Sequence, residues 1–322
     1  MNNATRTAFF GLLVACAVTY LLFSFFSMEA PSSREDAVAE DPLPPEMNRL
    51  FEICLATEDP HRRTASFGSY FQSLTKLRSA EIAIARAQEL KHQGALDDCH
   101  IIAHYVGEAN LDKHDSDLGK ALATCPTGCL HGCIHGAVQT YVSRKDSFES
   151  FIAELDHVCD VVQHDARLQR QCIHGVGHGF LTGNFLPLGA ALAACRKFGT
   201  KHEETCLGGV FMENMRQYVE LSPDELTKAI PDICRDAVST NDATHTRLCV
   251  DSIGEGLMFH TGHDLRRSLE SCDRVAHAHR DVCKRAAIAE ARHAPHRFDV
   301  TACDHAPAQY RNWCGNLLDG RE

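Results

Sequence analysis

Cys172-Ile-His-Gly-Val-Gly-His-Gly179 repeats an earlier stretch, Cys129-Leu-His-Gly-Cys-Ile-His-Gly136, with cysteine, histidines and glycines at the same offsets. On a helix, histidines four residues apart lie on one face. Each glycine costs a helix about 1 kcal/mol relative to alanine, so repeated glycines indicate that another backbone comes close. The motif predicts a helix that begins at a cysteine and presents paired imidazoles. Its close contacts would be made by Gly132, Gly136, Gly175 and Gly179.

The other cysteines extend this motif into a repeat. Looser copies begin at Cys99, Cys206, Cys249, Cys283 and Cys314. Counted together with Cys129 and Cys172, successive opening cysteines are about 30 to 43 residues apart, which is the spacing of helix-hairpin repeats. In most copies a cysteine ends one amphipathic run and the next cysteine opens the following helix. This predicts the disulfides Cys54/Cys99, Cys125/Cys129, Cys159/Cys172, Cys195/Cys206, Cys234/Cys249, Cys272/Cys283 and Cys303/Cys314. Cys133 is left over, and it is also an alternative partner for Cys125.

The predicted fold is all-α, with about seven disulfide-stapled α/α hairpins that form a solenoid or a toroid over residues 46–322. We expect the first helices over residues 47–54 and 75–93, and others over 118–125 and 148–159. The arrangement resembles the tetratricopeptide family and related cysteine-stapled helix-hairpin repeats. The likeness covers roughly residues 46–320 and rests on repeat length and cysteine placement. The tyrosine-bearing consensus of those families is absent, so the resemblance implies a fold and assigns no functional residue.

The N-terminus predicts a membrane anchor. Residues 8–28 form an uncharged apolar run that is long enough to span a bilayer. Arg6 precedes the run and acidic residues follow it, so residues 1–29 are expected to form a cytoplasmic tip and a transmembrane signal-anchor. Residues 30–45 then form a flexible linker, and the rest of the chain lies in the periplasm or outside the cell. A lipoprotein signal at Leu13-Val-Ala-Cys16 is the alternative.

The composition agrees with an exported protein that does not bind nucleic acid. The formal net charge is -11, which opposes binding to phosphate backbones. The chain has 16 cysteines and no Cys-x-x-Cys motif, so disulfides in an oxidising compartment are favoured over zinc ribbons.

Three histidine pairs at four-residue spacing are the candidate site. In stacked repeats equivalent positions lie side by side, and two carboxylates occupy the matching positions of a later copy. Neutral imidazoles at this spacing are good ligands for Zn, Cu or Ni, so we expect a divalent transition metal. An anionic ligand at the helix N-termini, or histidines that only support the core, are the alternatives. The candidate metal ligands are His100, His104, His131, His135, His174, His178, Asp251 and Glu255.

Catalysis is not established by the sequence. Cys133 lies between two histidines, so a thiol–imidazole nucleophile is one hypothesis, and a disulfide or a buried thiol is the other. The leading function is a membrane-anchored, extracytoplasmic helical-repeat protein that binds a divalent metal, as a carrier or a metalloenzyme. The alternative is a non-catalytic repeat scaffold with a peptide or anionic partner on its surface.

Overall fold

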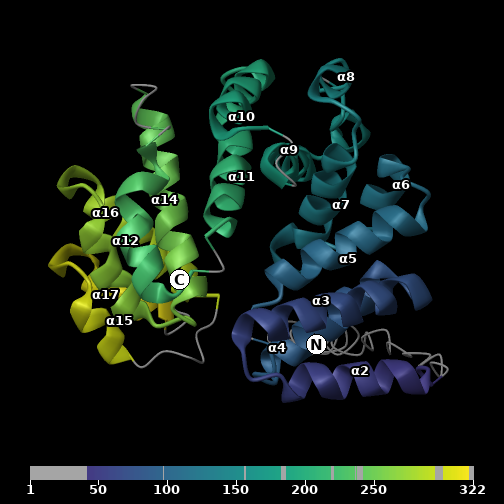
Figure 1. The fold of residues 1–322 in the computed structure, drawn as a ribbon, viewed down its shortest axis with the longest axis horizontal. Helices are drawn as coiled ribbons and strands as arrows, with labels where there is room; N and C mark the ends of the chain where they lie inside the picture. Colours follow the sequence, from purple (N-terminus) through teal and green to yellow (C-terminus); the bar gives the residue numbers. More distant parts are fainter. Residues whose placement is uncertain are drawn as a thin grey trace, which may run out of the picture. The chain divides into compact units, whose positions relative to one another are not determined.

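A computed structural model describes residues 42–318, apart from 97, 156, 183–185, 219–220, 236, 238–241 and 294–299. Pro45–Glu322 forms one compact unit. The described residues contain helices, turns and bends but no strand, which confirms the all-α prediction (Figure 1).

The described residues of the first half of the unit form seven α-helices. They are α2 (Pro45–Ala56), α3 (Pro60–Leu77), α4 (Ala80–His92), α5 (His100–Lys113), α6 (Leu118–Ala123), α7 (Gly132–Ser143) and α8 (Phe148–Ile152). One helix predicted over 75–93 is therefore two. The chain breaks at Ser79, whose side chain accepts a hydrogen bond from the backbone N–H of Ile82 and so caps α4. The helix predicted over 148–159 ends early, at Ile152.

The second half continues with α9 (Ala166–Leu181), α10 (Leu188–Cys195), α11 (Glu203–Arg216), α12 (Pro223–Ile233), α14 (Ala243–His260), α15 (Leu265–Ser271), α16 (Arg280–Ala291) and α17 (Arg311–Leu318). Short 3₁₀ segments are η1 (Cys129–His131), η2 (Asp160–Val162), η4 (Arg196–Phe198), η5 (Cys272–Arg274), η6 (His277–His279), η8 (Val300–His305) and η9 (Ala308–Tyr310). A capping box begins α12: the Ser222 side chain accepts from the backbone N–H of Glu225, and the Glu225 side chain accepts from the backbone N–H of Ser222.

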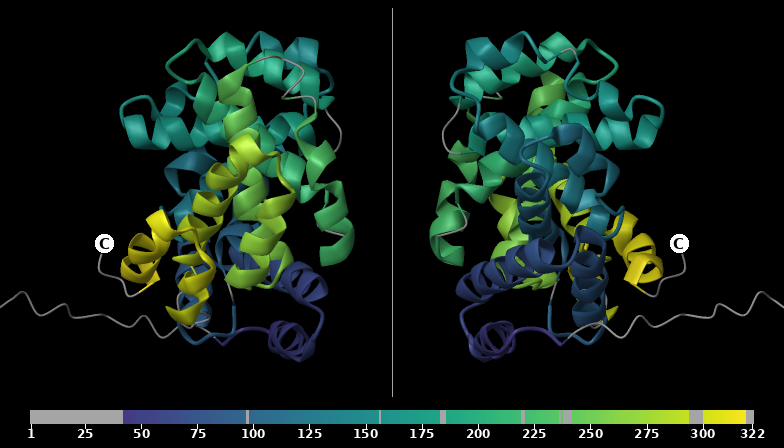
Figure 2. Two further views of the ribbon diagram at one scale, coloured as in Figure 1. Left: turned by 90° about the vertical axis from the view of Figure 1, so that its left-hand side faces the viewer. Right: turned by 90° about the vertical axis from the view of Figure 1, so that its right-hand side faces the viewer.

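The longer helices pack in the order of the chain. Contacts join α3 to α5, α5 to α7, α7 to α9, α9 to α11, α11 to α14 and α14 to α16 (Figures 1 and 2). The apolar faces of α5, α7, α9, α11 and α14 share a core, to which the short helix α8 adds Phe151; Phe151, Phe180 and Phe211 are fully buried in it. The number of repeats and the solenoid or toroid form stay predictions.

Seven disulfides staple the described helices. Five of them are the predicted couples from Cys159–Cys172 to Cys303–Cys314. Each closes a loop of 11 to 15 residues. The chain-entropy account of disulfides gives about 3 kcal/mol for loops of this size.

The couples Cys54/Cys99 and Cys125/Cys129 predicted near the N-terminus are wrong, whereas the alternative pairing of Cys125 with Cys133 is confirmed. Cys99 pairs with Cys129, and Cys125 pairs with Cys133. Cys54, predicted to pair with Cys99, is a buried free thiol 3.2 Å from the Ser66 hydroxyl. The hypothesis that Cys133 is a nucleophile is also wrong, because its sulfur is already in a disulfide.

Helices do not begin at most of the repeat cysteines, contrary to the prediction. Cys99 does stand immediately before α5. However, α9 begins at Ala166, after Asp165, and α14 begins at Ala243, after Asp242, so each helix begins six residues before its motif cysteine. Each aspartate accepts hydrogen bonds from backbone N–H groups of the first turn and so fixes the start of the helix. The motif therefore lies inside these helices.

Residues 1–41, with the predicted membrane segment at 8–28 and most of the linker, lie outside the described residues. Among the helices that are described, none has the length and apolar character needed to cross a membrane.

Candidate metal centre

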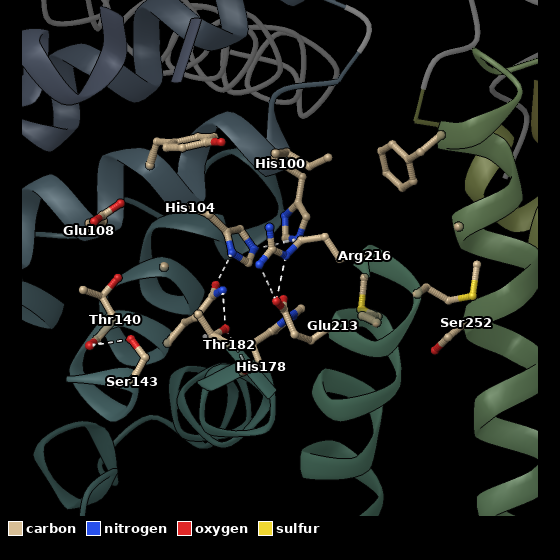
Figure 3. Close-up of a pocket in the computed structure, with 18 of the residues that line it drawn as sticks. His100, His104, Glu108, Thr140, Ser143, His178, Thr182, Glu213, Arg216 and Ser252 are labelled. Carbon is tan, nitrogen blue, oxygen red and sulfur yellow. Dashed lines mark hydrogen bonds and ion pairs between the residues drawn. The ribbon is translucent and has the colours of Figure 1, made fainter. Parts of the chain in front are cut away.

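Five histidines converge from three helices that pack in series, α5 against α7 and α7 against α9. His100 and His104 come from α5, His135 from α7, and His174 and His178 from α9. Ring centroids of neighbouring imidazoles in this group, here called the histidine cluster, lie 4.7 to 5.9 Å apart. Figure 3 shows His100, His104 and His178 directed toward one another from their helices.

Glycines allow this convergence because they let the helix backbones come close. A Cβ built on Gly136 would lie 2.0 Å from the carbonyl oxygen of His104. The same holds at Gly209, 2.0 Å from the carbonyl oxygen of His174, and Gly175 would bring its Cβ within 3.2 Å of the His135 Cα. The prediction that the glycines of the motif contact a neighbouring helix is confirmed, and the contacts of Gly136 and Gly175 lie beside a histidine of the cluster.

Hydrogen bonds fix the protonated nitrogen of the two histidines on α5. The Nδ1 of His100 lies 3.1 Å from the carbonyl oxygen of Cys129. The Nδ1 of His104 lies 2.8 Å from Oε1 of Gln139. Both partners are acceptors, so each Nδ1 carries the proton and each Nε2 keeps its lone pair.

The orientation of the Gln139 amide follows from its other contact. The Thr182 hydroxyl donates to the carbonyl oxygen of His178 at 2.9 Å, so its oxygen accepts from Gln139 Nε2 at 2.7 Å. This places Gln139 Oε1 toward His104. The hydrogen bonds thus run from α9 through α7 to the imidazole on α5.

The two histidines on α9 have the same arrangement. The Nδ1 of His174 lies 3.3 Å from the carbonyl oxygen of Thr205, and the Nδ1 of His178 lies 3.3 Å from Oε2 of Glu213. Burial alone would raise the pKa of Glu213, but hydrogen bonds from His178 and Arg216 outweigh it and lower this pKa. Glu213 is therefore ionised and accepts from Nδ1–H of His178, as the Thr205 carbonyl oxygen accepts from Nδ1–H of His174. In the neutral form of each ring the Nε2 then keeps its lone pair.

His135 uses its other nitrogen. Its Nε2 lies 2.7 Å from Oε1 of Gln171 and donates to it. Its Nδ1 is buried and has no hydrogen-bond partner. A buried nitrogen lone pair without a partner is costly unless something fills the position. All five rings of the cluster thus have one nitrogen held by an acceptor and one free lone pair.

The free lone pairs face each other. The Nε2 atoms of His100 and His104 are 3.3 Å apart, and those of His174 and His178 are 3.2 Å apart. Two lone pairs at this distance repel unless a cation lies between them. Nitrogen ligands about 2.0–2.1 Å from a tetrahedral zinc lie about 3.3–3.4 Å from each other. Each pair therefore has the spacing of one edge of such a site.

A shared proton would also relieve the repulsion, but the surroundings oppose it. Burial, and then the neighbouring imidazoles, lower the pKa of His104, His135 and His174 well below the ordinary value. Burial also lowers the pKa of His100. These four rings are therefore neutral near pH 7, the form in which imidazole binds metals.

The cluster contains two sets of three nitrogens that can hold a metal ion. One set is His100, His104 and His135, and the other is His135, His174 and His178. Within each set the ligand atoms lie within 4.8 Å of one another. Three histidines with an open fourth position are a common donor set for catalytic zinc.

His131, also predicted to be a ligand, belongs to neither set. Residues 129–131 have left-handed backbone angles, with φ of 51°, 54° and 62°. The helix α7 therefore begins only at Gly132, and His131 is not stacked one turn before His135. The His131 ring is buried, and neither of its nitrogens has a hydrogen-bond partner.

The two predicted carboxylates lie on α14 and are in neither set. Glu255 lines a cavity of about 360 Å³ together with His100, His104 and His178. Burial, and then the charge of Asp251, raise the pKa of Glu255 to about 7. Asp251 does not line the cavity; one of its oxygens lies 4.0 Å from Nη1 of Arg247. Apolar side chains, including Met212, Met215 and Phe259, line much of the cavity.

Gln139, Thr182 and Glu213 hold the imidazoles, and the sequence reasoning missed them. Two of them carried a signal. Gln139 follows His135 by four residues and Thr182 follows His178 by four residues, so each continues a histidine stripe by one helical turn. Glu213 had no such signal, because it comes from another helix and lies one residue after the position that matches His178.

Comparison of the chain with protein-family models, with curated proteins and with solved structures finds no match. The fold and the geometry of the cluster are therefore the basis for assigning a function.

Proposed function

We propose that this protein binds a divalent transition-metal ion, such as Zn, Cu or Ni, through the histidine cluster. One observation carries the proposal. Four Nε2 lone pairs face each other in two pairs, 3.3 and 3.2 Å apart, while every Nδ1 behind them is held by an acceptor. A hydrogen bond from the far nitrogen of an imidazole is the usual support of a metal-bound histidine.

The cavity beside the cluster gives solvent or a small ligand a route to the imidazoles. Three neutral imidazoles leave the charge of a dication uncompensated, so a small anion or a water molecule from the cavity would complete the coordination. The ionised Glu213 bonds to His178 and Arg216, so it supports the cluster from outside the two ligand sets.

The disulfides support a location outside the cytoplasm. Seven disulfides in one helical unit are typical of proteins in an oxidising compartment. With an anchor at residues 8–28, the domain would be a membrane-tethered, periplasmic or extracellular helical-repeat protein that carries a metal ion or uses it. The serial contacts of the long helices support the repeat.

Metal content and affinity test the proposal. The full-length oxidised chain, stripped with a chelator, is dialysed against Zn²⁺, Cu²⁺ or Ni²⁺ and analysed by elemental mass spectrometry. The double variant His104→Ala/His178→Ala removes one ligand from each set and should weaken binding at least about tenfold, as loss of an outer-shell partner already does. Circular dichroism checks that the variant is folded.

The control is His157→Ala. The His157 side chain is 77% exposed, and its ion-pair partner is Asp160, which is not part of the cluster. It should bind metal as the wild-type chain does. A wild-type chain that retains no metal, or a double variant that binds as tightly as wild type, would overturn the proposal and leave the histidines as supports of the core.

A further inference from the structure

We propose that the cluster is two overlapping metal positions that share His135, and that a single ion can occupy either. This inference rests on the proposed metal binding. Position A is His100, His104 and His135; position B is His135, His174 and His178. An ion would move between them by exchanging one histidine pair for the other while it stays bound to His135.

The spacing of the ligand atoms separates the two positions. The described residues give two sets of three ligand atoms within 4.8 Å rather than one set of five. Ligands on opposite sides of an ion lie only about 4.2 Å apart when each bond is about 2.1 Å. Five imidazoles therefore do not close around one ion without movement of the helices, which the glycine contacts hold close together.

The protonation of His135 limits the two positions to one ion. Its Nε2 donates to Gln171, so only Nδ1 has a free lone pair. One lone pair serves one ion at a time. Both ligand sets consist of imidazoles alone, and neither contains a carboxylate that would screen two neighbouring dications from each other. Occupying one position therefore opposes occupying the other.

Each position has a ligand at the cavity. His100 and His104 of position A line it, and so does His178 of position B, whereas His135 and His174 do not. An ion can therefore enter from the cavity at either position, and the shared histidine lies behind both. This arrangement gives a ligand-exchange path within the protein, which suits a carrier that hands an ion on.

Stoichiometry and affinity in matched variants test this arrangement. The full-length chain is titrated with Zn²⁺ and with Co²⁺, whose visible absorption reports on coordination. The variants are His100→Ala/His104→Ala, which removes the pair of position A, His174→Ala/His178→Ala, which removes the pair of position B, and His135→Ala. X-ray absorption spectroscopy of the zinc form counts the imidazole ligands, and His→Asn versions replace any alanine variant that fails to fold.

The proposal expects one ion per chain in the wild type and in each pair variant, with about three imidazoles bound in all of them. His135→Ala should weaken binding about 10–100-fold, because both positions lose a ligand. Two ions per chain in the wild type, five bound imidazoles, or a pair variant that binds no ion would each overturn the shared-histidine arrangement while leaving metal binding intact. A wild-type chain that binds no metal would instead contradict the proposed function.

Discussion

The α-carbon of Gly136 faces the carbonyl oxygen of His104 so closely that a methyl group on it would lie 2.0 Å from that oxygen. Gly136 lies on α7, next to His135 of the histidine cluster, and His104 of the cluster lies on α5. Backbone contact and ligand placement are therefore one feature of this interface.

Gly136→Ala is expected to destabilise the protein by about 1–3 kcal/mol, because the added methyl group forces the two backbones apart. It should also weaken metal binding by moving His104 relative to His135. Chemical denaturation gives the change in unfolding free energy. Gly189 is the matched control: it lies in α10 with nothing within 4 Å of a built Cβ. Gly189→Ala should be neutral or stabilise by up to about 1 kcal/mol through helix propensity.

Gln139→Leu should weaken metal binding about 10–100-fold, because the His104 Nδ1–H loses its acceptor and the ring is free to turn. Gln139→Glu keeps an acceptor oxygen at that position and should retain binding. Calorimetric titration with Zn²⁺ measures both. Equal affinities for the leucine and glutamate variants would show that the hydrogen bond to His104 does not orient a metal ligand.

His131→Ala should leave metal binding unchanged, although the sequence motif pairs His131 with His135. The reason is that His131 lies before α7 on left-handed backbone and belongs to neither ligand set. His135→Ala, four residues along, should weaken binding strongly. Equilibrium dialysis with Zn²⁺ compares them, and a large loss in the His131 variant would mean that the loop rearranges around a bound ion.

Glu290→Gln should stabilise the metal-free protein more at pH 8 than at pH 5. Burial, and then Glu255, raise the pKa of Glu290 from 4.5 to about 8. The native state thus binds more protons than the unfolded state between these values, and stability from this group is lost as pH rises through that window. Denaturation in chelator at both pH values measures the difference.

Peptide mapping should distinguish the disulfides near the N-terminus. Trypsin releases Cys99 in residues 92–113, Cys54 in 50–62, and Cys125, Cys129 and Cys133 together in 121–144. The structure links 92–113 to 121–144 and leaves 50–62 as a free thiol. A linkage between 50–62 and 92–113 would restore the pairing expected from the sequence order.

Sequence spacing predicted the features that depend on neighbours along the chain. The five couples from Cys159/Cys172 onward close short loops, so proximity alone selects the partner. The histidine pairs on α5 and α9 and the glycine contacts follow from the helical period.

Spacing failed where the chain leaves the helical path. Three cysteines between 125 and 133 allow several short loops, and sequence order does not rank them. The left-handed run at 129–131 begins at Cys129, whose disulfide partner is Cys99 immediately before α5, and no local pattern encodes this pairing or the position of His131. The contact of Glu213 on α11 with His178 on α9 likewise depends on how the two helices pack, so no local pattern encodes it.

The hydrogen bonds from Thr182 through Gln139 to His104 have a further consequence, for entropy. They hold the imidazole in one rotamer and one tautomer before any ion arrives. A free side chain gives up conformational freedom when it binds a ligand, whereas a side chain already fixed gives up little. The folded helices therefore act as a preorganised receptor: the ordering of the ligand belongs to folding, and the arriving ion meets a geometry that is already in place.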